Sequence, residues 1–76
     1  MASYLGHKNK QYWNVSLWLN NDEGLYNLMK RARRRSRTAK EAAEEVLEFL
    51  REGGIHKTPD GYAYTVPAIA AAMRGI

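Results

Sequence analysis

Residues 38–54 carry the signals for both the start and the end of one amphipathic helix. Thr38 followed three residues later by Glu41 is a capping box, in which side chains satisfy free backbone N–H groups at a helix start. Gly53 and Gly54 favour a helix end. The spacing predicts a helix over 38–52 with a broad apolar face, formed by Ala42, Ala43, Val46, Leu47, Phe49 and Leu50.

Residues 12–19 fit two kinds of secondary structure. Trp13, Val15, Leu17 and Leu19 alternate as in a strand, whereas Val15, Trp18 and Leu19 also fit one face of a helix. We predict a helix over about 12–20, because Asn20 and Asn21 end it and another helix begins at once.

The next segment has its own start signal. Asn20 followed three residues later by Glu23 is a second capping-box pattern, and Asp22 and Glu23 suit the positive end of a helix dipole. We predict a helix over 21–35, with an apolar stripe formed by Leu25, Leu28, Met29 and Ala32.

The C-terminal third combines a turn and a short helix. The sequence Thr-Pro-Asp-Gly at 58–61 is typical of a turn, and the alternation around it predicts a minimal hairpin between 55–57 and 62–64. Thr65 can cap a last helix over 66–74. This helix is rich in alanine, so it is either buried or offers a small-residue face to a homodimer partner.

The length and the aromatic content together indicate one small domain. A chain of 76 residues has room for a single domain over 1–76 with one modest core, and the polar segment 1–10 is expected to be an N-terminal arm. Two Trp, five Tyr and one Phe can supply core area, so we expect Trp13, Trp18 and most tyrosines to be core residues. The predicted fold class is all-α, with three to four helices.

Composition argues against several kinds of site. The chain has no Cys, which excludes disulfides and thiol-based metal sites, and His7 and His56 alone do not make a zinc site. No window reaches the roughly 18 apolar residues of a membrane span, and segment 1–10 lacks the apolar region of a secretory signal. We therefore expect a cytoplasmic protein with no metal, no cofactor and no membrane partner.

Two opposite charge blocks lie next to each other in the chain. Residues 30–37 contain six cations and no acid. Five glutamates follow, offset only by Lys40 and Arg51; they are Glu41, Glu44, Glu45, Glu48 and Glu52. Charge segregation of this kind, in a chain with a net charge of +4, predicts a charged partner.

The basic block is the main candidate binding site. Clustered Arg and Lys side chains bind phosphates or acidic protein surfaces, although they also occur as a solvated helix face. The candidate residues are Lys30, Arg31, Arg33, Arg34, Arg35 and Arg37. Tyr62 and Tyr64, on the predicted turn, are expected to be exposed aromatic contacts.

Neither ordinary DNA readout nor catalysis is favoured. If the helices at 21–35 and 38–52 formed a helix-turn-helix motif, the second would carry five carboxylates towards phosphates. His56 and Asp60 could meet across the turn, but no Cys nucleophile, phosphate loop or metal-spaced cluster accompanies them. We predict that the protein is not an enzyme.

The stretch from Trp13 to Tyr26, WNVSLWLNNDEGLY, resembles a signature of small, largely uncharacterised proteins of phages, plasmids and bacteria. The turn at 58–61 resembles the same pattern more loosely. The resemblance implies that Trp13, Trp18, Asn21, Asp22 and Tyr26 are pattern residues of the core and helix junction. It transfers no activity, but it implies a mobile-element setting; the basic block and the last helix lie outside the pattern.

Two functions of different kinds follow from these observations. In the first, the protein docks on a host protein or nucleoprotein complex of nucleic-acid metabolism, as an inhibitor of CRISPR or restriction defence would. In the second, it binds DNA or RNA directly through the arginine-rich helix, as an accessory or regulatory factor. Salt dependence separates them, because direct phosphate binding weakens steeply with salt.

Overall fold

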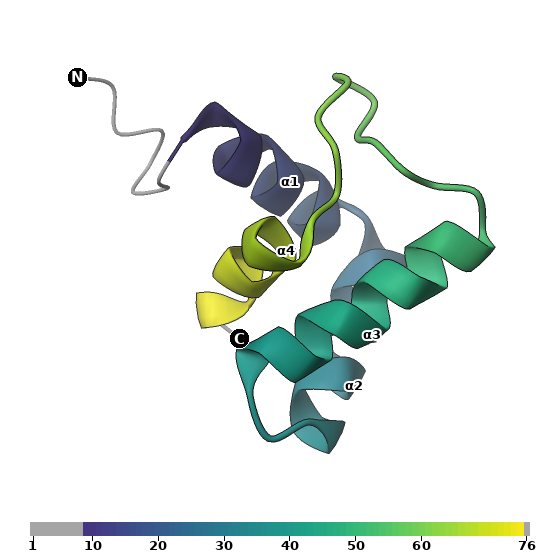
Figure 1. Ribbon diagram of the computed structural model, residues 1–76. Helices are drawn as coiled ribbons and strands as arrows, with labels where there is room; N and C mark the ends of the chain where they lie inside the picture. Colours follow the sequence, from purple (N-terminus) through teal and green to yellow (C-terminus); the bar gives the residue numbers. More distant parts are fainter. Residues whose placement is uncertain (1–8, 76) are drawn as a thin grey trace.

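The computed structural model describes residues 9–75, and its secondary structure is helical (Figure 1). Within these residues there is no strand, which confirms the predicted all-α class and the choice of helix for 12–19. The elements in chain order are α1 (Lys10–Asn21), α2 (Glu23–Arg35), α3 (Ala39–Glu52), α4 (Val66–Ala72) and a closing 3-10 turn, η2 (Met73–Gly75). Of the arm predicted for 1–10, residues 1–8 lie outside the described residues, and Lys10 already belongs to α1.

A single residue, Asp22, separates α1 from α2, and the N-cap of α2 is not the predicted Asn20. The predicted cap Asn20 lies inside α1, where its amide donates a hydrogen bond to the Ser16 carbonyl over 2.7 Å. Asp22 is the N-cap of α2 instead: its carboxylate accepts a hydrogen bond from the Leu25 N–H at 2.9 Å. The Asp22 N–H also donates to the Trp18 carbonyl at the end of α1. A carboxylate at this position satisfies a free N–H group and favours the helix dipole, which explains the sharp junction.

The predicted caps of α3 and α4 are confirmed. Thr38 Oγ1 accepts a hydrogen bond from the Glu41 N–H at 3.1 Å, and Thr65 Oγ1 accepts one from the Ala68 N–H at 3.3 Å. The Glu41 carboxylate does not complete a regular capping box, because it accepts from the N–H of Arg37, one residue before the cap. The cap still satisfies the first turn of α3.

The end of α3 is a Schellman motif. Gly54 has φ of 75°, a left-handed conformation that glycine adopts without steric cost. Its N–H donates to the Arg51 carbonyl at 3.0 Å, and the Ile55 N–H donates to the Leu50 carbonyl at 2.8 Å. These two bonds define the motif and explain why the helix stops at the glycine pair.

The predicted hairpin is reduced to one bridge. Lys57 and Ala63 form an isolated antiparallel pair, which is too little to make strands. The turn itself is present: the Thr58 N–H donates to the Tyr62 carbonyl at 2.8 Å, and Gly61 has φ of 92°. Thr58 is buried, and its hydroxyl accepts from the Tyr62 N–H. The Tyr64 N–H donates to the His56 carbonyl at 3.0 Å, so turn bonds and the two bonds around the single bridge hold this segment.

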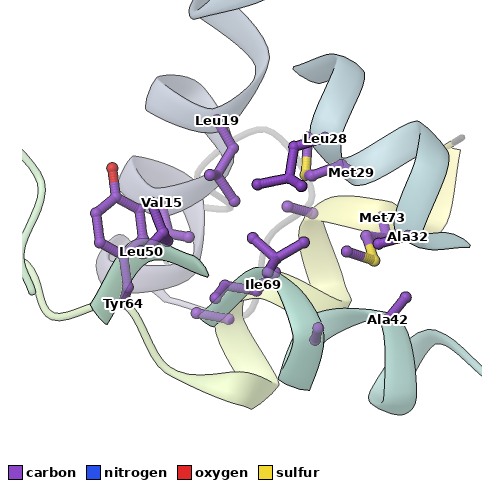
Figure 2. Close-up of a cluster of buried hydrophobic side chains, with 14 residues drawn as sticks. Val15, Leu19, Leu28, Met29, Ala32, Ala42, Leu50, Tyr64, Ile69 and Met73 are labelled. Carbon is purple, nitrogen blue, oxygen red and sulfur yellow. The ribbon is translucent and has the colours of Figure 1, made fainter. Parts of the chain in front are cut away.

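The core lies where α4 packs against both α1 and α3, with α2 packed on α3 (Figures 1 and 2). Helix α4 contributes Ala68, Ile69 and Ala72, so its alanine-rich sequence serves burial within the chain. The buried apolar side chains are Val15, Leu19, Leu28, Met29, Ala32, Ala42, Ala43, Val46, Leu50, Tyr64, Ala68, Ile69, Ala72 and Met73. Side chains from all four helices converge there.

Three large aromatic side chains are placed differently from the prediction. Trp13 and Trp18 were expected in the core, but both are only half-buried, on α1. Phe49, which the apolar pattern of α3 assigned to the packed face, is 53% exposed. The small side chains of Ala32, Ala42 and Ala43 let the helices approach closely, so the central core is filled without these rings.

Candidate binding surface

Helix α2 presents the basic block to solvent because its apolar stripe faces the core. Leu28, Met29 and Ala32 are buried, and the cations occupy the remaining arc of the helix. Arg31, Arg34 and Arg35 on α2, and Arg37 just after it, are exposed. Lys30 and Arg33 are half-buried. We call these six residues the basic surface: Lys30, Arg31, Arg33, Arg34, Arg35 and Arg37.

Three of the six cations already have a partner within the chain. Arg35 forms an ion pair with Glu45 of α3. Arg33 Nη1 donates to the Ser36 carbonyl at 3.5 Å.

Lys30 is the third cation with a partner: its Nζ lies 5.5 Å from the centre of the Tyr26 ring, within cation–π range. Within residues 9–75, the side chains of Arg31, Arg34 and Arg37 have no such partner. These three arginines are therefore the charges that remain available for another molecule.

A shallow hollow concentrates part of this charge. It has a volume of about 430 Å³ and is lined by Gly24, Asn27, Lys30, Arg31 and Arg34. We call it the basic hollow. Residues three and four apart lie on one helix face, which brings Lys30, Arg31 and Arg34 together with the Asn27 amide. Three cationic groups and an amide can bind an anion such as a phosphate or a carboxylate.

A second hollow lies on the surface between α2 and α3, and the α2 wall and the α3 wall carry opposite charge. It has a volume of about 340 Å³ and is lined by Leu28, Arg31, Arg35, Glu45, Glu48, Phe49 and Glu52. We call it the charged groove. Arg31 borders both hollows, so the acidic residues of α3 begin where the basic surface ends. Any large partner that covers α2 also meets the carboxylates of α3.

A third hollow is mainly apolar and lies beside the α1–α2 junction. Its volume is about 350 Å³, and its lining includes Trp18, Leu25, Ile55, Pro59 and Tyr64. Ile55 is 41% exposed there. No local sequence signal predicts this hollow, because its lining comes from α1, α2 and the long loop before α4.

The turn at 58–61 is fastened to α1 by a carboxylate. Asp60 Oδ2 accepts hydrogen bonds from Asn14 Nδ2 at 2.8 Å and from Trp18 Nε1 at 3.0 Å. These two bonds, helped by the positive charge of Lys10, hold the pKa of Asp60 below its ordinary value. We call Asn14, Trp18 and Asp60 the turn clasp. The sequence suggested that Asp60 could meet His56, but its carboxylate is hydrogen-bonded to α1 instead. The role of Asp60 is therefore to position the turn.

The two tyrosines predicted as exposed contacts are not equivalent. Tyr64 is 7% exposed and belongs to the core beside Val15 and Leu50 in Figure 2, so that prediction is wrong. Burial, followed by the charge of Asp22, raises the pKa of its hydroxyl. Tyr62 is half-buried, with Lys10 Nζ 6.0 Å from its ring centre.

The whole chain, residues 1–76, matches the sequence pattern of DUF7249, a family of unknown function. The chain belongs to DUF7249. No curated protein and no solved structure matches it. Membership agrees with the resemblance to small uncharacterised proteins, and the family description names no activity.

Two further kinds of site, a metal cluster and a membrane-spanning helix, are absent from the described residues of this DUF7249 protein. Among residues 9–75, no three acidic or histidine side chains gather in a way that could hold a metal ion. None of the described helices has the length and apolar character needed to cross a bilayer. The basic surface is a candidate site because its cations are on the solvent-facing arc of α2 and three of them have no partner among the described residues.

Proposed function

We propose that this DUF7249 protein is a non-enzymatic binding module that docks on a protein or nucleoprotein complex through the basic surface. The observation that carries the proposal is the set of three exposed arginines without a partner among the described residues: Arg31, Arg34 and Arg37. Exposed charges contribute little to the stability of a fold. They do steer association and select a complementary partner, which is the role proposed here.

The neighbouring carboxylates favour a protein partner over duplex nucleic acid. Packed helices lie about 8–10 Å apart, so a duplex laid across α2 would also cover the outer face of α3. Four of the five glutamates of α3 are exposed. The distance is close to the Debye length of about 8 Å at physiological salt, so their repulsion of phosphates would not be screened out. A protein surface can match a mixture of charges that a polyanion cannot.

Direct nucleic-acid binding is the second candidate, and the basic hollow favours a single strand for it. A single strand that follows the outer arc of α2 would meet Lys30, Arg31 and Arg34 without crossing α3. In this alternative the protein is an accessory or regulatory factor, and its affinity depends strongly on salt.

We further propose a mobile-element origin and a bacterial host cytoplasm as the place of action. The support is the resemblance of the segment from Trp13 to Tyr26 to small phage, plasmid and bacterial proteins. In that setting, docking on host nucleic-acid machinery would inhibit a defence system, of the CRISPR or restriction type. The net charge of +4 argues against mimicry of DNA by the whole chain, which would require an acidic protein.

The first experiment is a titration with labelled random-sequence DNA and RNA, single- and double-stranded, at about 50 and 200 mM salt. The docking proposal expects no more than weak binding at either salt concentration. Binding that is micromolar or tighter at low salt and falls by orders of magnitude at the higher salt would replace it with the direct-binding alternative.

The second experiment changes the basic surface alone. The variant Arg34→Glu/Arg37→Glu is compared with Lys40→Glu/Arg51→Glu, which has the same net charge but alters exposed cations of α3 outside the basic surface. Capture from a bacterial host lysate identifies a partner, and the purified partner is then titrated. We expect the affinity of the first variant to fall about 100-fold, because two cations are replaced by groups of the opposite charge. Each tenfold loss in affinity corresponds to about 1.4 kcal/mol of binding free energy. Equal affinities for the two variants would contradict the proposal.

A further inference from the structure

The charged groove contains an exposed aromatic side chain that the fold does not use. Phe49 is 53% exposed although it lies next to Leu28 in the same groove. Leu28 itself is buried, so the floor of the groove is apolar while its rim is ionic. An aromatic side chain at the centre of a polar rim is typical of a protein–protein contact.

The two walls of the groove have opposite charge. Arg31 and Arg35 lie on the α2 wall, and the α3 wall carries Glu45, Glu48 and Glu52. In the described chain, one ion pair joins the walls, between Arg35 and Glu45. Arg31 and Glu48 line the groove without an ion pair to each other or to another described residue. Among the described residues, Arg31 on the α2 wall and Glu48 and Glu52 on the α3 wall therefore remain unpaired.

We propose that the charged groove is a homodimer interface, in which two copies of the chain meet about a twofold axis. Phe49 of one copy packs against Phe49 of the other, and Arg31 of each copy lies opposite Glu48 of its partner. A twofold contact uses the same patch on both subunits, so a patch with one basic and one acidic wall is complementary to itself. The contact between Arg31 and Glu48 then forms twice.

The charge of the walls selects this occupant over others. A uniformly acidic segment would meet Glu48 and Glu52, and a uniformly basic one would meet Arg31 and Arg35. Like charges across an interface oppose association. The partner must therefore carry both signs around an apolar centre, and a second copy of this chain has that pattern.

The size of the face sets the expected strength. Helices of 13 and 14 residues are about 20 Å long, and two of them side by side present a face of roughly 20 by 20 Å. That is about half of the roughly 800 Å² per partner found in stable interfaces. We therefore expect a weak dimer, with a dissociation constant of about 10 to 100 µM.

Dimer formation goes beyond the proposed docking function, and the two are separable. Arg31 and Arg35 belong to the basic surface and also line the charged groove. Between these two hollows, Arg34 lines the basic hollow and not the groove, whereas Phe49 lines the groove and not the basic hollow. Two basic surfaces on one dimer would raise the apparent affinity for a partner that has two matching sites. The docking variant Arg34→Glu/Arg37→Glu is expected to dimerise like the wild type, so failure of one proposal leaves the other standing.

Sedimentation equilibrium of the purified protein tests the interface. We expect the mass to rise from 8.7 kDa towards twice that value as concentration increases from about 5 to about 500 µM. Phe49→Ala should weaken the association at least tenfold, and its circular dichroism should match the wild type because the ring is exposed. A mass that stays at 8.7 kDa throughout, or a dimer unaffected by Phe49→Ala, would overturn the proposal.

Charge reversal identifies the partner as a second copy. Arg31→Glu alone and Glu48→Arg alone each place like charges opposite one another and should be monomers. An equimolar mixture of the two variants should form a heterodimer, because each contact then joins an arginine to a glutamate. Glu44→Arg, on α3 outside the groove, is the control and should associate like the wild type. Failure of the mixture to associate would contradict the twofold pairing.

Discussion

The turn clasp and the basic surface use charge in opposite ways. Asp60 is exposed, yet its carboxylate is held by two uncharged donors from α1, which lie 42 and 46 residues away in the sequence. The cations of the basic surface lie within eight consecutive residues. Three of them, Arg31, Arg34 and Arg37, have no side-chain partner in the described chain.

The charge of Asp60 therefore stabilises the fold, whereas the charges of the three arginines are available to bind another molecule. The clasp fixes the long segment between α3 and α4 against α1, beside which it runs in Figure 1. Its charge is already satisfied, so a partner that bound it would have to replace hydrogen bonds within the protein. The basic surface needs no such exchange. Changes to the clasp should therefore affect stability, and changes to the basic surface should affect binding.

The largest expected effect on stability comes from a single atom change in the clasp. Asn14 is 2% exposed and donates to the Asp60 carboxylate. Asn14→Asp keeps the shape but puts a buried carboxylate next to another one. We expect a loss of about 3 kcal/mol in the free energy of unfolding at pH 7. Urea denaturation followed by circular dichroism measures it.

A matched change in the basic hollow provides the control. Asn27→Asp is the same substitution at an exposed position of α2, beside Lys30 and Arg31. We expect a change within about 0.5 kcal/mol, because the new charge is solvated and has cations nearby. If both variants lost the same stability, the distinction between the two regions would be wrong.

The second effect is smaller and depends on pH. Hydrogen bonds from Asn14 and Trp18 lower the pKa of Asp60 in the folded state. The stabilisation is therefore present above the ordinary aspartate pKa of about 3.9, and it is lost as the pH falls through the folded-state pKa. Asp60→Asn should destabilise the protein at pH 7 and have less effect at about pH 3.

Urea midpoints at the two pH values check this prediction. The difference between Asp60→Asn and the wild type should shrink on acidification. Glu44→Gln, which changes an exposed carboxylate without a partner among the described residues, should not show this pattern. A pH-independent difference for Asp60→Asn would mean that the shape of the turn, and not the charge of Asp60, fastens it to α1.

Signals that depend on neighbouring residues predicted most of the fold. The caps at Thr38 and Thr65 and the glycine pair after α3 lie where the sequence placed them, because each acts within a single helical turn. The α1–α2 junction was misplaced by two residues. Asn20 and Asp22 both suit an N-cap, and the choice depends on how far α1 continues, which its packing against α4 helps to set.

The candidate sites could be predicted only in part. The basic surface is local in sequence, so its residues were found, but which cations remain free depends on Glu45, Ser36 and Tyr26. The turn clasp joins residues 46 apart, for which the sequence has no local signal. The exposure of Phe49 likewise depends on how α2 packs on α3, since periodicity alone places the ring on the apolar face.

The smallest expected effect is at the ion pair between the two charged regions. Arg35 and Glu45 have side chains that are 69% and 36% exposed, so solvent screens their attraction. A double-mutant cycle with Arg35→Ala and Glu45→Ala should give a coupling energy of about 0.5 kcal/mol or less. The same measurement at high salt should reduce it further. A coupling above about 1.5 kcal/mol would mean that α3 fixes part of the basic surface in place, and that Arg35 belongs with the structural charges of the clasp and not with those available to a partner.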